Sequence, residues 1–202
     1  MESINKQKIL KNFPEKNMYH KDTTSLKWKN DLIDFFQDKN LKSCLEIGTC
    51  KGVTTKVLSY LFEHVYTIEN NSSRLDDAKQ FCSDRNNITY ILGDVYNNDT
   101  YTDFPKTFDA VLIDCMHLYP HVIADINRVL TFFNEDTGLY LIFDDYGHPE
   151  STGVKTAVDE AINMGLQIET HIGEDPGFTV NRIDGSQFTI LHKEGIILSY
   201  GK

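Results

Sequence analysis

Acidic side chains follow five successive apolar runs of the chain, where they can bind a ligand or exchange a proton. The first run ends in LEIGTCKG, which places Glu46 two residues before Gly48 and six before Gly52. The acids after the later runs are Glu69, Asp94, Asp114, Asp144 and Asp145. Carboxylates accept hydrogen bonds, hold hard divalent cations and act as general acids or bases. The pattern indicates a site for a polar small molecule, a cation, or both.

The runs that carry these acids alternate with amphipathic stretches. The apolar runs predict strands at 42–47, 65–69, 88–92, 108–113 and 138–143. The stretches with helical spacing lie at 51–62, 72–84, 119–133 and 152–164. Short buried strands that alternate with helices favour a doubly wound α/β fold, in which helices cover both faces of a mostly parallel sheet. Ligands bind beyond the carboxyl ends of such strands, so the acids are expected to gather there.

Both ends of the chain depart from this alternation. Residues 24–38 carry apolar side chains at helical spacing and predict an N-terminal helix, with Thr23 or Thr24 as its N-cap. Near the other end, 166–172 and 187–193 are β-rich and too close together for a helical crossover. We expect these two runs to pair antiparallel as a C-terminal hairpin.

The expected organisation is therefore a sheet of about seven strands in a single globular unit. Residues 41–202 form that unit, and residues 1–40 form an N-terminal helical cap segment. The length of 202 residues, of which 40% are hydrophobic, fits one domain with a substantial core.

Charge and composition restrict the partners. The formal net charge of −10 argues against a broad electrostatic contact with nucleic acid and favours a small-molecule partner. No apolar run has the length of a membrane span or signal peptide, and the four cysteines form no C-x-x-C pair. The composition predicts a cytoplasmic protein that binds neither membrane nor nucleic acid, and it leaves homo-oligomerisation open.

The alternation, together with LEIGTCKG, resembles the class I S-adenosylmethionine-dependent methyltransferases over roughly residues 40–193. The resemblance implies a Rossmann-like sheet closed by a reversed strand, with S-adenosylmethionine as cofactor. The acid and glycines of LEIGTCKG would line the methionine part, because glycine lets backbone approach a ligand without a Cβ. Gly93 and Asp94 resemble the motif at the adenine edge. The implied cofactor-binding residues are Glu46, Gly48, Thr49, Gly52, Glu69, Asn70, Gly93, Asp94 and Asp114.

Glu69 has a spacing that suits ribose recognition. It ends the second strand 21 residues after Gly48, where a carboxylate can accept hydrogen bonds from both ribose hydroxyls. The alternative is an ordinary acid at a helix entry, before the cap-like residues 71–73.

Two later segments, 112–126 and 139–158, resemble metal-dependent O-methyltransferases, especially the small-molecule and macrolide-sugar group. In that group the acid ending the fourth strand and the acidic pair ending the fifth hold a divalent metal. The resemblance implies a metal site of Asp114, Asp144 and Asp145, and Met116 stands where the group commonly has a second acid. Ligands that are all oxygen favour Mg²⁺ or another hard divalent cation.

These residues predict metal-assisted O-methylation of a small hydroxylated molecule. A metal stabilises the acceptor alkoxide, and His117, with Asp114 beside it, is the expected catalytic base. A structural role for His117 in its loop is the alternative. Two other functions stay open: metal-independent methyl transfer to oxygen or nitrogen, and a cofactor-binding module without turnover. The sequence does not identify the acceptor, whose pocket Tyr146 and His148 are placed to line.

Overall fold

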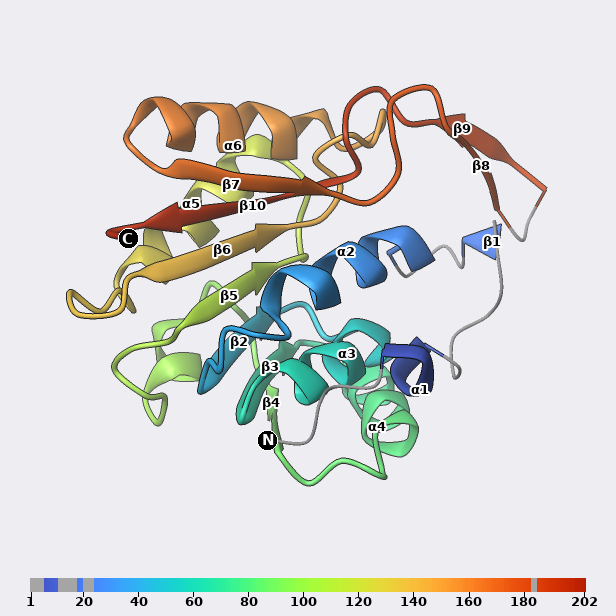
Figure 1. Cartoon of the computed structure of the whole chain (residues 1–202). Coiled ribbons are helices and arrows are strands. Elements are labelled where there is room, and N and C mark those ends of the chain that lie inside the picture. Colours follow the sequence, from blue (N-terminus) through green and yellow to red (C-terminus); the bar gives the residue numbers. More distant parts are fainter. Residues whose placement is uncertain (1–5, 11–17, 20–23, 183–184) are drawn as a thin grey trace.

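The computed structural model describes residues 6–10, 18–19, 24–182 and 185–202. Its central sheet is made of β2 Ser43–Ile47, β3 His64–Glu69, β4 Ile88–Leu92, β5 Ala110–Ile113, β6 Leu139–Phe143, β7 Gln167–Ile172 and β10 Gly195–Tyr200. The strand order is β4-β3-β2-β5-β6-β10-β7 (Figure 1). β10 runs antiparallel to both of its neighbours, β6 and β7, and all other neighbouring strands in this sheet pair parallel. The prediction of a doubly wound, mostly parallel sheet of about seven strands is confirmed.

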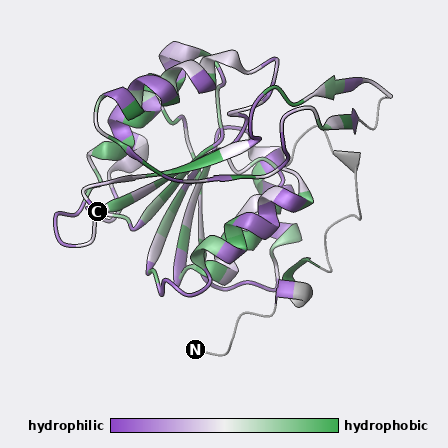
Figure 2. Cartoon of the chain, turned by 45° about the horizontal axis from the view of Figure 1, so that its top comes forward, coloured by the Kyte–Doolittle hydropathy of each residue, from purple (hydrophilic) through white to green (hydrophobic). Residues whose placement is uncertain are grey.

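Helices cover both faces of the sheet because successive strand residues point to opposite sides. Cys44 packs in one hydrophobic cluster with α2 Leu26–Phe36 and α3 Val53–Leu61, while Leu45 packs in the other with α5 Tyr119–Leu130 and α6 Thr152–Asn163. The remaining long helix of the described residues, α4 Ser72–Phe81, packs against α3 and β4. Hydrophobic residues concentrate on the strands between these layers (Figure 2).

The expected pairing of 166–172 with 187–193 is wrong. β7 pairs antiparallel with β10, whereas Gln187–Thr189 forms β9 and pairs with β8 Thr179–Arg182 in a second, small sheet. The reason is burial. Residues 195–199 are all buried between β6 and β7, while 187–189 are mostly exposed. A strand with both faces covered needs the unbroken apolar run that 195–200 supplies.

The small sheet also takes in β1 Met18–Tyr19, which lies parallel to β8. It stands beyond the carboxyl ends of the central strands (Figure 1). The backbone N–H of Leu191 donates to the carbonyl of Gly147, and the Phe188 ring lies 4.2 Å, centroid to centroid, from that of His148. The small sheet is therefore attached to the loop that follows β6.

The N-terminal helix, predicted over 24–38, spans Leu26–Phe36. Ser25, not Thr24, is the N-cap of α2, because its hydroxyl accepts from the N–H of Trp28. Thr23, the other expected cap, lies outside the described residues. A short helix, α1 Lys6–Leu10, precedes α2 and buries Ile9 in the cluster shared by α2 and α3. The boundary expected at residue 40 remains a prediction.

Among the described residues, no helix combines the length and apolar character needed to cross a membrane.

Candidate active site

A pocket of about 330 Å³ opens at the carboxyl ends of β2, β3, β4 and β5. Six of the nine predicted cofactor-binding residues line it: Gly48, Glu69, Asn70, Gly93, Asp94 and Asp114. The pocket also takes in residues that the sequence did not single out for the cofactor: Cys50, Ile68, Arg74, Val95, Tyr96, Cys115 and Met116. Strand ends far apart in sequence thus form one cavity, as the doubly wound fold requires.

Gly48 shapes the pocket floor by allowing two loops to touch. Its φ is +101°, and a Cβ added there would lie 1.9 Å from the carbonyl oxygen of Asp114. The N–H groups of Gly48 and Thr49 both donate to the carbonyl of Ile68 at 3.1 Å. The loop after β2 is therefore wedged between the ends of β3 and β5, and only glycine fits at this point.

Glu46, Thr49 and Gly52 do not line the pocket. Glu46 is fully buried, and its Oε2 accepts hydrogen bonds from the Thr55 and Thr67 hydroxyls at 2.5 and 2.6 Å. Burial raises the pKa of Glu46 to about 8. Its Oε1 has no hydrogen-bond partner in the part of the chain that the structure describes. Glu46 is therefore predominantly protonated at neutral pH.

Thr49 and Gly52 stabilise the loop after β2 through contacts outside the pocket lining. The Thr49 hydroxyl is hydrogen-bonded to that of Thr67. Gly52 begins α3 with a φ of +77°, and a Cβ there would lie 2.9 Å from Cβ of Ala78 in α4. Gly52 thus permits close packing of α3 on α4.

Glu69 is fixed at the pocket wall by backbone donors. Its Oε2 accepts from the N–H of Cys50 at 2.9 Å, and its Oε1 accepts from the N–H of Asn71 at 3.0 Å. Asn71 itself caps α4 through its side chain, so the helix does not depend on Glu69 for its cap. The contact with Asn71 fits the helix-entry alternative and the place of Glu69 on the pocket wall fits the ribose role, so both stay predictions.

A second group of side chains gathers next to the pocket. Ligand atoms of Asp114, His117 and Asp145 lie within 4.8 Å of one another. His117 Nδ1 is 3.1 Å from Asp145 Oδ2, and its Nε2 is 3.5 Å from Asp114 Oδ1. Because Asp114 also lines the pocket, this group adjoins the expected methyl end of the cofactor site.

The backbone at Asp145 is strained in a way that serves this contact. Its φ is +59°, the left-handed region that a residue with a Cβ rarely adopts. Such strain is found mainly where the surrounding structure enforces it, often at functional sites. Ser151 completes the environment, since its hydroxyl lies 3.3 Å from Asp145 Oδ2 and 3.4 Å from His117 Nδ1.

Burial and the nearness of other carboxyl groups together set the electrostatics of this acidic site. Burial raises the pKa of Asp144 well above its usual value, and the charges of Asp145 and Asp114 add to the effect. Burial likewise raises the pKa of Asp145 to about 6, although His117 opposes the shift. The pKa of His117 is raised by its interaction with Asp114 and by the charge of Asp145, against burial. A cation would relieve this repulsion.

Asp144 lies outside the three-residue group that the structure brings together. Its Oδ1 is buried and has no hydrogen-bond partner among the described residues. Tyr146 and His148, expected near the acceptor, do not line the pocket. The Tyr146 hydroxyl donates to Asp159 at 2.8 Å, and the His148 ring packs on Phe188.

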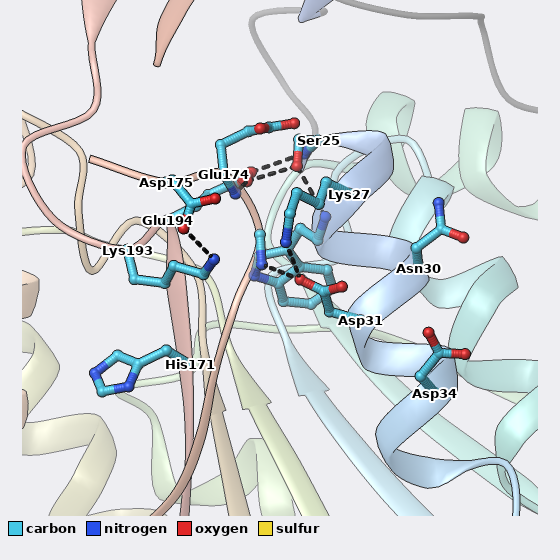
Figure 3. A network of polar contacts seen from close by, with 12 residues as sticks. Ser25, Lys27, Asn30, Asp31, Asp34, His171, Glu174, Asp175, Lys193 and Glu194 are labelled. Atoms are coloured by element: carbon cyan, nitrogen blue, oxygen red, sulfur yellow. Dashed lines mark hydrogen bonds and ion pairs between the residues drawn. The ribbon is translucent and has the colours of Figure 1, made fainter. Parts of the chain in front are cut away.

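Sequence reasoning missed two buried charged residues beside this site. Lys29 of α2 is 2% exposed and Glu194, directly before β10, is 3% exposed. The Glu194 carboxylate accepts from the N–H and hydroxyl of Ser25 at 2.8 and 2.5 Å and from the N–H of Glu174 at 2.8 Å (Figure 3). Lys29 could have been found, because it falls on the apolar stripe of its helix with Leu32, Ile33 and Phe36.

Comparisons with known proteins agree with this geometry. A family profile described as a methyltransferase domain matches residues 45–146. A comparison with curated protein sequences gives no match.

Three solved structures show the same fold. An O-methyltransferase of Bacillus cereus in complex with S-adenosylhomocysteine has 18% identity and a TM-score of 0.63, over 96% of this chain and 89% of that one. The N-methyltransferase NodS of Bradyrhizobium japonicum has 13% identity and a TM-score of 0.58, over 85% and 92%. Aeropyrum pernix fibrillarin with bound S-adenosylmethionine has 16% identity and a TM-score of 0.53, over 79% of this chain and 66% of its own length.

The matched family segment runs from the strand that carries Glu46, through the pocket, to the acidic site at Asp145. The chain therefore belongs to the class I S-adenosylmethionine-dependent methyltransferases.

Proposed function

We propose that this methyltransferase transfers its methyl group to a hydroxyl of a small molecule, assisted by a divalent metal ion held by Asp114, Asp144 and Asp145. The observation that carries the proposal is the convergence of Asp114, Asp145 and His117 within 4.8 Å beside the cofactor pocket. The cofactor supplies the methyl group, and the site beside it must bind the oxygen that receives it.

The acidic site suits a hard cation. Its carboxylate oxygens are the ligands that Mg²⁺ prefers. The pKa values of Asp144 and Asp145 are raised first by burial and further by neighbouring negative charges, which an ion would neutralise. The buried, unpartnered Oδ1 of Asp144 offers a further oxygen. When bound, the ion would lower the pKa of an acceptor hydroxyl and hold its oxygen in place.

His117 is proposed as the base that takes the hydroxyl proton. Asp145 lies 3.1 Å from its Nδ1, as second groups commonly orient catalytic imidazoles, and its Nε2 lies 3.5 Å from Oδ1 of Asp114, which also lines the pocket. The two neighbouring carboxylates also raise its pKa, which makes it a better proton acceptor. Glu69 is proposed to accept from the ribose hydroxyls and Asp94 from the adenine amine.

A second candidate function is methyl transfer to oxygen or nitrogen without a metal. It is favoured by the 3.1 Å contact between His117 and Asp145, since a protonated His117 already supplies a positive charge to the acids. In that case the carboxylates would orient an amine acceptor.

Several observations support a small acceptor over a nucleic acid. The net charge is −10, and the pocket is lined by three acidic side chains, Glu69, Asp94 and Asp114, and one basic side chain, Arg74. A polyanion would be repelled from such an edge.

Turnover on a panel of catechols, vicinal diols of glycosides, and primary amines tests the proposal, with Mg²⁺ or with EDTA. We expect O-methylated products that require Mg²⁺. N-methylated products that form equally well in EDTA would support the second candidate instead.

A further inference from the structure

The N-terminal helix α2 brings a buried lysine to the acidic edge of the sheet. Lys29 is 2% exposed, and its ammonium group donates to the backbone carbonyl and the hydroxyl of Thr24, the latter at 2.7 Å. Thr24 precedes the N-cap of α2, so the ammonium lies at the N-terminal end of the helix. Both burial and the helix dipole disfavour a positive charge at this place.

Several contacts hold this end of α2 against the strands that carry the acids. Ile196 of β10 pairs with Phe143 of β6, so Glu194 and Gly195 stand beside the end of β6, where Asp144 begins the loop. A Cβ on Gly195 would lie 2.3 Å from Nε1 of Trp28, the residue before Lys29.

Glu194 ties these parts together. Its carboxylate accepts from the N–H and hydroxyl of Ser25 (Figure 3). Its backbone carbonyl accepts from the N–H of Gly147 at 3.2 Å. One residue thus joins the start of α2 to the loop after β6. The position of Lys29 relative to the acids is therefore built into the fold.

The acids are what make the buried charge tolerable. Burial lowers the pKa of Lys29 to about 8, while Asp144, Glu194 and Asp114, in that order, favour its charged form. Two of these three acids, Asp144 and Asp114, are proposed to bind the metal.

We infer that Lys29 is a positioning residue that supplies a built-in countercharge to the acidic site and thereby limits its affinity for divalent cations. Without it, Asp114, Asp144 and Asp145 would form a more negative site that held an ion too tightly to adapt its coordination to the acceptor. This inference rests on the proposed metal centre, but it assigns a role to a residue of the N-terminal helix.

The test is the dissociation constant for Mn²⁺, measured by electron paramagnetic resonance on the full chain with S-adenosylhomocysteine present. Lys29→Gln removes the charge and keeps a donor for Thr24. We expect it to bind Mn²⁺ about tenfold more tightly than the unmodified protein, because one positive charge no longer repels a dication. Lys29→Arg keeps the charge and should stay within about twofold of the unmodified protein.

Lys27→Gln is the matched control, since Lys27 lies on the same helix but its side chain is 38% exposed and paired with Asp31 at 2.7 Å. It should leave the dissociation constant unchanged. Lys29→Met serves if Lys29→Gln does not fold, because apolar replacement of a buried charge commonly preserves stability.

The outcomes separate this inference from the metal proposal. Unchanged or weaker Mn²⁺ binding in Lys29→Gln, with normal binding in the unmodified protein, would refute the role of Lys29 and leave the metal centre standing. Binding only in Lys29→Gln would support the role of Lys29 and contradict metal dependence in the natural chain. Absence of binding in both would refute both.

Discussion

His117 Nδ1 lies 3.1 Å from Asp145 Oδ2, and this contact joins the loop after β5 to the loop after β6. The contact places the imidazole of His117 next to the carboxyl group of Asp145 at the edge of the cofactor pocket. Asp145 adopts a left-handed backbone, with a φ of +59°, at this contact. This relationship gives the first prediction.

His117→Gln should reduce turnover by about 10² or more, the usual contribution of a positioned base. Mg²⁺ affinity should change little, because oxygen ligands and not His117 are proposed to hold the ion. Initial rates and a Mg²⁺ titration of the same sample measure both quantities. His64→Gln, at the start of β3 and outside the pocket lining, is the control and should keep its activity. A parallel loss of Mg²⁺ affinity in His117→Gln would show that His117 is a ligand.

Mg²⁺ should raise the melting temperature, because an ion that binds only the native state stabilises it. Asp145→Asn and Asp144→Asn should each abolish most of this gain while leaving S-adenosylhomocysteine affinity intact. Scanning calorimetry with and without Mg²⁺ measures the effect. Asp136→Asn, an exposed change, should behave as the unmodified protein does. If Asp144→Asn keeps the full gain, Asp144 is not a ligand.

Gly48→Ala should destabilise the protein and abolish cofactor binding, because its Cβ would collide with the carbonyl of Asp114. Gly177→Ala is a matched control. It shares a positive φ, +87°, but nothing lies within 4 Å of its added Cβ. We expect a loss of about 1 kcal/mol for Gly177→Ala and roughly 2–4 kcal/mol more for Gly48→Ala, measured by denaturant unfolding. Equal losses of unfolding free energy in the two variants would mean that the loops after β2 and β5 move apart to accommodate the added methyl group without cost.

Glu46 should make the protein less stable as pH rises. Its folded-state pKa is about 8 and its ordinary value is 4.5, so the folded state holds a proton that the unfolded state releases between these values. The contribution of Glu46 to the free energy of unfolding is therefore fully present below pH 4.5. It falls by up to about 1.4 kcal/mol per pH unit between pH 4.5 and pH 8. Other buried acids contribute with the same sign.

The difference between Glu46→Gln and the unmodified protein isolates the effect of Glu46. The free energy of unfolding of Glu46→Gln should fall less steeply between pH 5 and 8. Identical slopes for the two proteins would show that Glu46 ionises normally despite its burial.

Glu69→Gln should weaken cofactor binding by roughly 1–3 kcal/mol, because the amide nitrogen of glutamine cannot accept the second ribose hydroxyl. Calorimetric titration with S-adenosylhomocysteine gives the value. Glu63→Gln, outside the pocket, is the control and should match the unmodified protein. An unchanged affinity would favour a structural role for Glu69 in its two backbone contacts.

The grouping of the residues that follow the strands could be predicted from sequence, because a parallel sheet brings the carboxyl ends of its strands to one edge. Glu69, Asp94 and Asp114 reach a common pocket for this reason alone. Gly48 was also readable, since glycine after a buried strand indicates a close approach of backbone.

The rest depended on tertiary packing. The C-terminal pairing was missed because 187–193 and 195–200 both have β-rich composition, and only burial between β6 and β7 selects the second. Lys29 and Glu194 were missed because neither follows a predicted strand, and helix docking alone brings them to the acids. Glu46 was expected at the ligand, but its hydrogen bonds with Thr55 and Thr67 turn it into the interior.

The most direct test of metal-assisted methyl transfer is a crystal structure with S-adenosylhomocysteine and Mn²⁺, read from the anomalous signal of the ion. The account predicts one ion bonded to oxygens of Asp114, Asp144 and Asp145, with the ribose on Glu69 and His117 outside the coordination sphere. A structure with the cofactor in place and no anomalous peak at these carboxylates, at millimolar Mn²⁺, would contradict it.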